Sequence, residues 1–167
     1  MTNAKIYRNP PQLVENIFLV TARCKIFYRD ISEFAHDIYK VEKKGEKVAV
    51  VALGDFYQKG EAVAAAIKSA LGFEPTLINP RFASGVDKKL LEDLKKDHGL
   101  VITLEDGITS GGFGEKIASF YGTSNMKVKN YGLEKKFYDR YNPAGLLKEL
   151  GMSTEQILAD VKGILGK

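Results

Sequence analysis

The stretch that most constrains the fold is residues 101–121, which reads VITLEDGITSGGFGEKIASFY. A β-branched run at residues 101–104 predicts a buried strand that ends at the acidic pair 105–106. A glycine-rich loop follows, and then a helical pattern whose apolar side chains share one face. Such a unit can bind an anion at the helix N-terminus, or it can be a tight corner between strand and helix.

Short apolar strands alternate with helical patterns along the rest of the chain. Strands are expected at residues 47–53, 75–79, 101–104 and within 124–130, and helices at 60–71, after Asp87, from Phe113, after Asn142 and after Ser153. The run KVAVVAL is apolar without alternation, which is typical of a strand buried on both faces of a parallel sheet. MKVKN alternates, which favours a strand at the sheet edge. We therefore expect an α/β fold, a doubly wound, mostly parallel sheet of about five strands with helices on both faces.

Several helix ends carry clear signals. Asn142 followed by Pro143 predicts an N-cap with proline at the first helical position. Ser153 to Gln156 reads as a capping box. Gly99 is expected to close the helix that begins after Asp87.

The chain divides by regularity. Residues 1–45 contain a proline pair and little periodicity, so we expect an N-terminal arm or linker there. The regular pattern begins near Lys47, and residues 46–167 are expected to form one α/β domain.

Composition excludes several classes of protein. The net charge is only +4, and the lysine pairs stand beside acids, which indicates solvated faces rather than a nucleic-acid footprint. No apolar run approaches the roughly 20 residues of a membrane helix, and no signal peptide is recognised, so a cytoplasmic protein is expected. A single cysteine excludes an internal disulfide, and one cysteine with two histidines disfavours a zinc site, so no metal site is predicted.

The candidate ligand groups lie where strands of a parallel sheet end, since ligands usually bind there. The glycine loop could form a phosphate or carboxylate cradle from Gly111, Gly112 and Gly114, although close packing of helix on sheet is the favoured interpretation. The loop has neither the spacing of a P-loop nor that of the dinucleotide fingerprint. Arg81 could bind a substrate anion, but an ion pair with Glu105 or Asp106 is favoured. Asp55 could hold a hydroxyl, but a turn or cap is favoured.

Other reactive side chains lack a catalytic setting. His98 is expected at a helix C-terminus, where a cation is favourable without any catalytic role. His36 is expected at the surface, and Cys24 is expected to be inert. No catalytic triad or set of metal ligands can be assembled, so no catalytic residue is assigned.

Three segments, taken in order, resemble a known family. They are VAVVALGDF at residues 48–56, INPRFASGVDKKLLEDL at residues 78–94 and VITLEDGITSGGFGEKIASF at residues 101–120. They are similar to the C-terminal domain of the transketolase-type thiamine-diphosphate enzymes, most of all the 1-deoxy-D-xylulose-5-phosphate synthases. The V-x-x-x-G-L strand and the E-L-G tail of that domain also have counterparts here. The resemblance covers about residues 40–165.

The resemblance also has departures. Residues 84–87 lack the usual proline, and the chain has no thiamine-diphosphate motif and no G-D-G metal-binding stretch. The stretch IFYRD at residues 26–30 resembles the R-Y-P-R-G segment that precedes the domain, whose arginine helps to bind substrate phosphate. Arg29 is therefore added to the possible anion-binding residues.

The resemblance implies a C-terminal domain, or a separate subunit, of a thiamine-diphosphate-dependent transferase. The expected role is structural, in packing and homodimer formation, and no complete active site is expected in this chain. Thiamine diphosphate and Mg²⁺ would be bound by the missing N-terminal and pyrimidine-binding domains or by a companion subunit. The family reaction joins pyruvate to glyceraldehyde 3-phosphate. The alternatives are a stand-alone module that binds a small anion, or part of another member of the superfamily, such as transketolase or a 2-oxoacid dehydrogenase β subunit.

Overall fold

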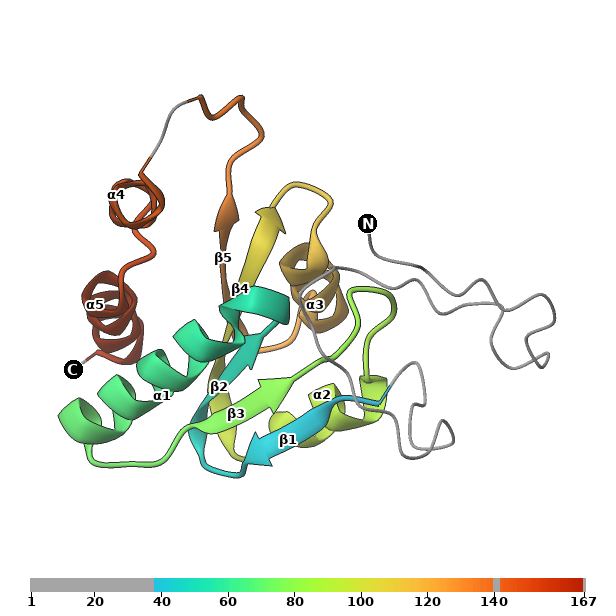
Figure 1. Ribbon diagram of the computed structural model, residues 1–167. Helices are drawn as coiled ribbons and strands as arrows, with labels where there is room; N and C mark the ends of the chain where they lie inside the picture. The colour runs from blue at the N-terminus through green and yellow to red at the C-terminus, as the bar shows by residue number, and fades with distance from the viewer. Residues whose placement is uncertain (1–37, 140–141, 167) are drawn as a thin grey trace, which may run out of the picture. The chain divides into compact units, whose positions relative to one another are not determined.

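The computed structural model describes residues 38–139 and 142–166, and these form a five-stranded sheet in the order β1-β3-β2-β4-β5 (Figure 1). The strands are β1 (Lys40–Lys43), β2 (Lys47–Ala52), β3 (Thr76–Asn79), β4 (His98–Ile108) and β5 (Lys127–Leu133). Strands β2 to β5 are mutually parallel where they pair, and β1 is antiparallel to β3. The predicted α/β fold with a mostly parallel sheet is confirmed.

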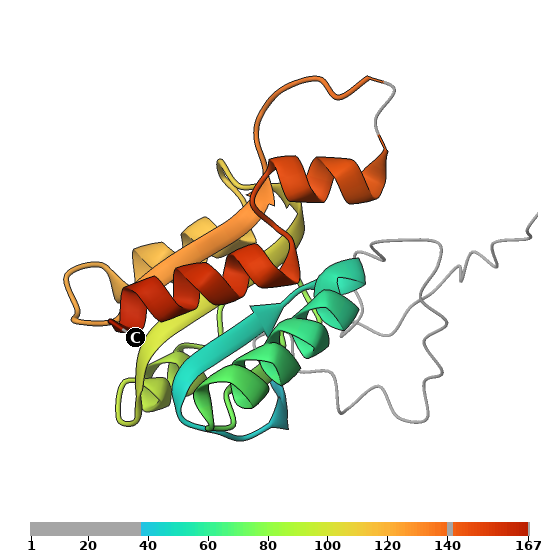
Figure 2. The same cartoon turned by 90° about the vertical axis from the view of Figure 1, so that its left-hand side faces the viewer.

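Helices cover both faces of this sheet. They are the 3₁₀ turn η3 (Gly54–Phe56) and the helices α1 (Tyr57–Leu71), α2 (Lys88–Leu94), α3 (Phe113–Tyr121), α4 (Pro143–Glu149) and α5 (Thr154–Leu165). Helices α1 and α5 lie next to each other on one face (Figure 2), and α2 and α3 pack on the other. The sheet is therefore doubly wound.

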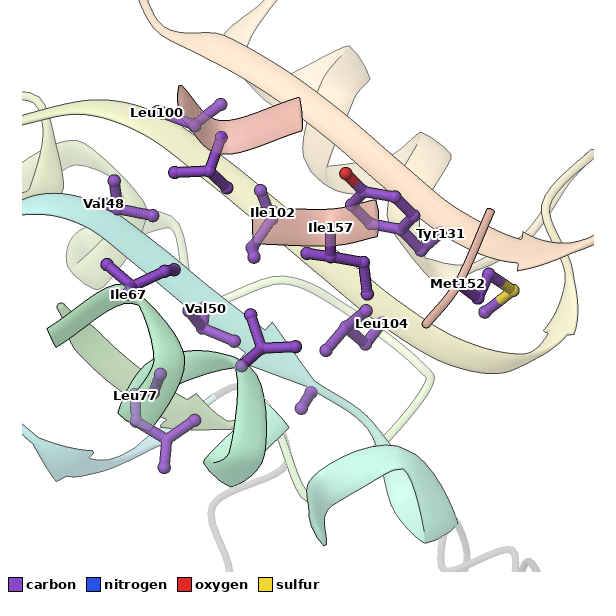
Figure 3. Packing of buried hydrophobic residues seen from close by; sticks show 14 of the residues in the cluster. Val48, Val50, Ile67, Leu77, Leu100, Ile102, Leu104, Tyr131, Met152 and Ile157 are labelled. Carbon is purple, nitrogen blue, oxygen red and sulfur yellow. The ribbon is translucent and has the colours of Figure 1, made fainter. Parts of the chain in front are cut away.

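The buried side chains form two clusters, one on each face of the sheet. In β2, Val48 and Val50 point to the cluster of α1 and α5 (Figure 3), whereas Ala49 and Val51 point to that of α2 and α3. Successive strand residues point to opposite faces. Because helices cover both faces of the sheet, the side chains of residues 48–52 in β2 are buried on each face. This explains why this run is apolar throughout and does not alternate.

Strand β1 lies within the segment that the sequence assigned to an arm. It pairs with β3 from Lys40 to Lys43, so the sheet begins before residue 46. Its sequence, KVEK, is short and polar because the strand stands at the sheet edge, and such a strand gives little apolar signal. Residues 1–37 are outside the described part, and the division into arm and domain stays a prediction.

The ends of several elements test the sequence signals directly. Asn142 accepts a hydrogen bond from the N–H of Gly145, and the capping box joins Ser153 to Gln156 in both directions. The edge position of β5 is also confirmed. The predicted helix end at Gly99 is wrong, since α2 ends at Leu94 and β4 already begins at His98.

Candidate functional site

Strand β4 continues past its predicted end, and this positions the candidate site. The acidic pair was expected to follow the strand, but β4 runs on to Ile108 with an irregularity in its pairing with β5. Leu104 pairs with Tyr131, whereas Ile108 pairs with Leu133, so β4 carries two extra residues over this interval. A bulge of this kind bends a strand and redirects its side chains.

The bulge carries Glu105, whose carboxylate caps the N-terminus of α3. One oxygen accepts the N–H of Phe113 at 2.9 Å, and the other accepts the N–H of Gly114 at 2.9 Å. Glu105 is only 4% exposed. Two hydrogen bonds to a charged acceptor, at the positive end of a helix, compensate for the loss of water around this carboxylate. The place where an external anion would bind is therefore occupied by a group of the protein itself.

Two glycines of the loop are required by this close packing. A Cβ on Gly112 would lie 2.8 Å from each carboxylate oxygen of Glu105 and even nearer to the carbonyl oxygen of Ile108. A Cβ on Gly114 would lie 2.5 Å from Oγ1 of Thr103 and 2.8 Å from Cγ of Asn130. Neither position has room for a side chain, which favours the packing interpretation of the loop.

The N–H groups of Gly111 and Gly112 also have acceptors within the chain. The N–H of Gly111 donates to Oε2 of Glu115 at 2.7 Å, and the N–H of Gly112 donates to the carbonyl of Thr109 at 3.0 Å. Gly111 itself has a φ of +74°, a left-handed conformation that glycine adopts without strain. Anion binding by Gly111, Gly112 and Gly114 stays a prediction, and it requires that an incoming anion displace a carboxylate.

A shallow depression lies beside this corner. It is lined by Gly111, Gly112, Glu115, Lys116 and Ser119. The ammonium of Lys116 donates to the carbonyl of Ala83 at 3.0 Å, and so ties α3 to the loop after β3. The depression thus presents one carboxylate and one ammonium that already has an acceptor, a weak setting for an anion.

Arg81 hydrogen-bonds to the backbone just before β1. Its φ is +65°, and its N–H donates to Oδ1 of Asn79 at 3.0 Å. Its Nη2 donates to the carbonyl of Ile38 at 2.8 Å. The favoured ion pair with Glu105 or Asp106 is wrong: among ion pairs that join described residues, none links Arg81 to either carboxylate, and Glu105 caps α3 instead. Substrate binding by Arg81 stays a prediction.

His98 lies inside the protein and not at a helix end. Its Nε2 is 2.8 Å from the hydroxyl oxygen of Thr76, and its Nδ1 is 2.6 Å from Oδ1 of Asp97. The same hydroxyl accepts the N–H of Gly45 at 2.9 Å. This network joins the β1–β2 turn, β3 and β4, so its role is to hold strands together. No local sequence pattern predicts this network, because Gly45, Thr76 and His98 are far apart in the chain.

Two buried tyrosines hydrogen-bond across elements. The hydroxyl of Tyr131 donates to Oδ2 of Asp160 at 2.8 Å, and that of Tyr121 donates to the carbonyl of Leu91 at 3.0 Å. Burial raises the pKa of both phenols above the ordinary value, and the bond to Asp160 raises the pKa of Tyr131 further. Both remain hydrogen-bond donors at neutral pH.

Of the remaining candidate residues, only Asp55 lies in the described part of the chain. Asp55 lies exposed in η3. Arg29, His36 and Cys24 are outside the described residues. Within residues 38–139 and 142–166, no cluster of three or more His, Cys, Asp or Glu side chains is arranged to bind a metal ion. In the same part of the chain, no helix has the length and apolarity to cross a membrane.

Residues 38–157 match the family described as "Transketolase, C-terminal domain". The chain belongs to this family. Its transketolase C-terminal domain accounts for all five strands and for most of the described helices. The resemblance predicted from the sequence is thereby confirmed at the level of the family.

Individual relatives show how much of a larger protein this domain represents. The chain is 31% identical over 131 residues to the 1-deoxy-D-xylulose-5-phosphate synthase of Clostridium perfringens, covering 77% of this chain and 21% of that enzyme. It is 31% identical over 129 residues to the probable chloroplastic 1-deoxy-D-xylulose-5-phosphate synthase of Capsicum annuum, covering 74% and 18%. The chain thus spans about a fifth of the length of these curated relatives.

A solved structure shares the fold of this transketolase C-terminal domain. It is described as "Split gene transketolase, inactive beta4 tetramer". The two superimpose with a TM-score of 0.68 at 24% identity, over 78% of this chain and 43% of the other.

Proposed function

We propose that this chain is the C-terminal domain, or a separate subunit, of a 1-deoxy-D-xylulose-5-phosphate synthase-like, thiamine-diphosphate-dependent transferase. The observation that carries the proposal is the family match over residues 38–157, together with the 31% identity to the Clostridium perfringens synthase. The reaction of such an enzyme joins a two-carbon unit from pyruvate to glyceraldehyde 3-phosphate. The role proposed for this chain is packing and association, not catalysis.

The geometry of the α3 corner supports a structural role. The N–H groups at the start of α3 bind Glu105, and the glycines provide close packing. In this proposal, thiamine diphosphate and Mg²⁺ are bound by the other four-fifths of the enzyme, and no residue of this chain is assigned to them. The likeness in fold to part of a split-gene transketolase chain is consistent with an enzyme made from more than one polypeptide.

The test is reconstitution. The full chain is purified together with each polypeptide of the same genome that carries thiamine-diphosphate-binding and pyrimidine-binding regions, and formation of 1-deoxy-D-xylulose 5-phosphate is measured. We expect no turnover by the chain alone and turnover by one of the mixtures. Absence of a complex and of turnover in every mixture contradicts the proposal. Turnover of a different ketose or 2-oxoacid would assign the chain to another branch of the superfamily.

A second proposal is a stand-alone module that binds a small anion through Gly111, Gly112, Gly114, Arg29 and Arg81. The observation behind it is that Lys116 lines the depression beside Gly111 and Gly112, and an anion bound there would have to compete with the carboxylates of Glu105 and Glu115. Calorimetry of the full chain with inorganic phosphate and with glyceraldehyde 3-phosphate tests it. Saturable binding to the chain alone would support this module, and heats of dilution alone would remove it.

A further inference from the structure

Strands β4 and β5 extend beyond the rest of the sheet at the end where the parallel strands finish (Figure 1). The last pair between β2 and β4 joins Ala52 to Leu104. Beyond that pair, β4 has only β5 beside it, as far as the pair Ile108 and Leu133. The loop before α3 packs against this ribbon, since Gly112 lies close to the carbonyl oxygen of Ile108, and the apolar side chains that stay exposed lie on the rest of its surface.

The extension presents apolar side chains to solvent. Phe137 is fully exposed, and Ile108 is 43% exposed. Phe137 lies in the turn that follows β5. Two hydrogen bonds within this turn hold it: the N–H of Glu134 donates to the Tyr138 hydroxyl at 3.0 Å, and the hydroxyl donates to the Glu134 carbonyl at 3.2 Å. The phenyl ring is therefore held outward on an ordered turn and is not packed into the domain.

We propose that this β4–β5 tip, formed by Ile108, Leu133 and Phe137, docks on the polypeptide that carries the thiamine-diphosphate-binding part of the enzyme. The inference rests on the proposed function and adds the surface through which the subunits meet. Burial of a phenyl ring is favourable through the hydrophobic effect, and aromatic side chains are common anchors of protein interfaces.

The size of the tip favours such a partner over a second copy of this chain. A stable interface buries about 800 Å² on each partner, whereas one phenyl ring and a half-exposed isoleucine supply a small part of that area. In a symmetric dimer the same small tip would have to serve on both sides. A partner with the other four-fifths of the enzyme's length can surround the tip and add contacts from its own surface.

The experiment compares binding of the parent chain and of three variants to the companion polypeptide identified by reconstitution. The variants are Phe137→Ala, Ile108→Ala and Val41→Ala. Val41 is a matched control, because it is 38% exposed and lies on β1, at the opposite edge of the sheet. We expect Phe137→Ala to weaken binding at least about tenfold and Ile108→Ala by less, with binding by Val41→Ala and all melting temperatures unchanged.

Each other outcome has a distinct meaning. If the parent and Phe137→Ala bind the partner equally, the docking surface is wrong and the proposed function stands. If the parent binds no companion polypeptide, both proposals fail. If Phe137→Ala lowers the melting temperature of the isolated chain, residues of the chain itself cover the ring. If it turns a dimer into a monomer in sedimentation velocity, the occupant is a second copy. Either of these last results overturns the assignment.

Discussion

The carboxylate of Glu105 accepts the backbone N–H of Phe113 at 2.9 Å, from a position eight residues earlier in the chain. The link joins the bulged end of β4 to the first turn of α3 across the glycine loop. The glycine loop has the composition of an anion-binding site, and the carboxylate of Glu105 occupies the position that an external anion would take. This one relationship explains why Gly112 has no space for a side chain and why the corner favours a structural role.

Replacing Glu105 should destabilise the fold. In Glu105→Gln the charge is lost, and one of the two N–H groups of α3 faces an amide NH₂ in place of an acceptor. We expect the free energy of unfolding to fall by about 1–3 kcal/mol. Urea denaturation of the two proteins measures it. The neighbouring Asp106 is exposed, so Asp106→Asn is the control and should change stability by less than about 0.5 kcal/mol. Equal stability of Glu105→Gln and the parent would contradict the capping role.

Adding one methyl group at Gly112 should be costly. The new Cβ would meet the Glu105 carboxylate and the Ile108 carbonyl, so the corner must open. We expect Gly112→Ala to lower the free energy of unfolding by about 2–4 kcal/mol. The control is Gly163→Ala in α5, where nothing lies within 4 Å of the new Cβ, and there the helix should gain about 0.5–1 kcal/mol. If both variants shift stability in the same direction, the packing explanation fails.

The Thr76 hydroxyl should contribute to strand packing. In Thr76→Val, Nε2 of His98 and the N–H of Gly45 both lose their partner inside the protein. We expect a loss of about 1–3 kcal/mol in urea denaturation, because buried polar groups without partners are unfavourable. Thr123 is exposed, so Thr123→Val should leave stability almost unchanged. A Thr76→Val protein as stable as this control would show that the network is dispensable.

Tyr131 should make stability depend on pH in the alkaline range. Its pKa is raised in the folded state, chiefly by burial and also by Asp160, whereas in the unfolded chain it titrates near the ordinary value of about 10. A group whose pKa is raised on folding contributes stability below the unfolded pKa, and this contribution is lost as pH rises. Stability should therefore fall above about pH 10, less steeply in Tyr131→Phe than in the parent. Urea denaturation at pH 8 and pH 11 gives the two slopes, and identical slopes would exclude this role.

The sequence predicted what local patterns determine. The run at residues 47–53 is apolar throughout because both faces of β2 are covered, and the caps at Asn142 and Ser153 act within four residues. The family resemblance rested on such segments and on their order.

What the sequence did not predict depends on contacts between distant segments. The acidic residues after Leu104 look like the end of a strand, but pairing with β5 carries β4 onward to Ile108. His98 looks like a helix end because its partner Thr76 is 22 residues away. Alternation along β4 already turns Glu105, like Val101, toward the face of α2 and α3. The capping contact forms only because the glycine loop brings the first N–H groups of α3 to that carboxylate.

The most direct test of the central claim is to follow the amide resonances of Phe113 and Gly114 while inorganic phosphate is added to the full chain. Glu105 holds both N–H groups, so the account predicts that the two ¹H–¹⁵N signals keep their positions up to millimolar phosphate, as the signals of α5 do. A saturable shift of both signals, absent from α5, would contradict it and would assign the α3 corner to an external anion.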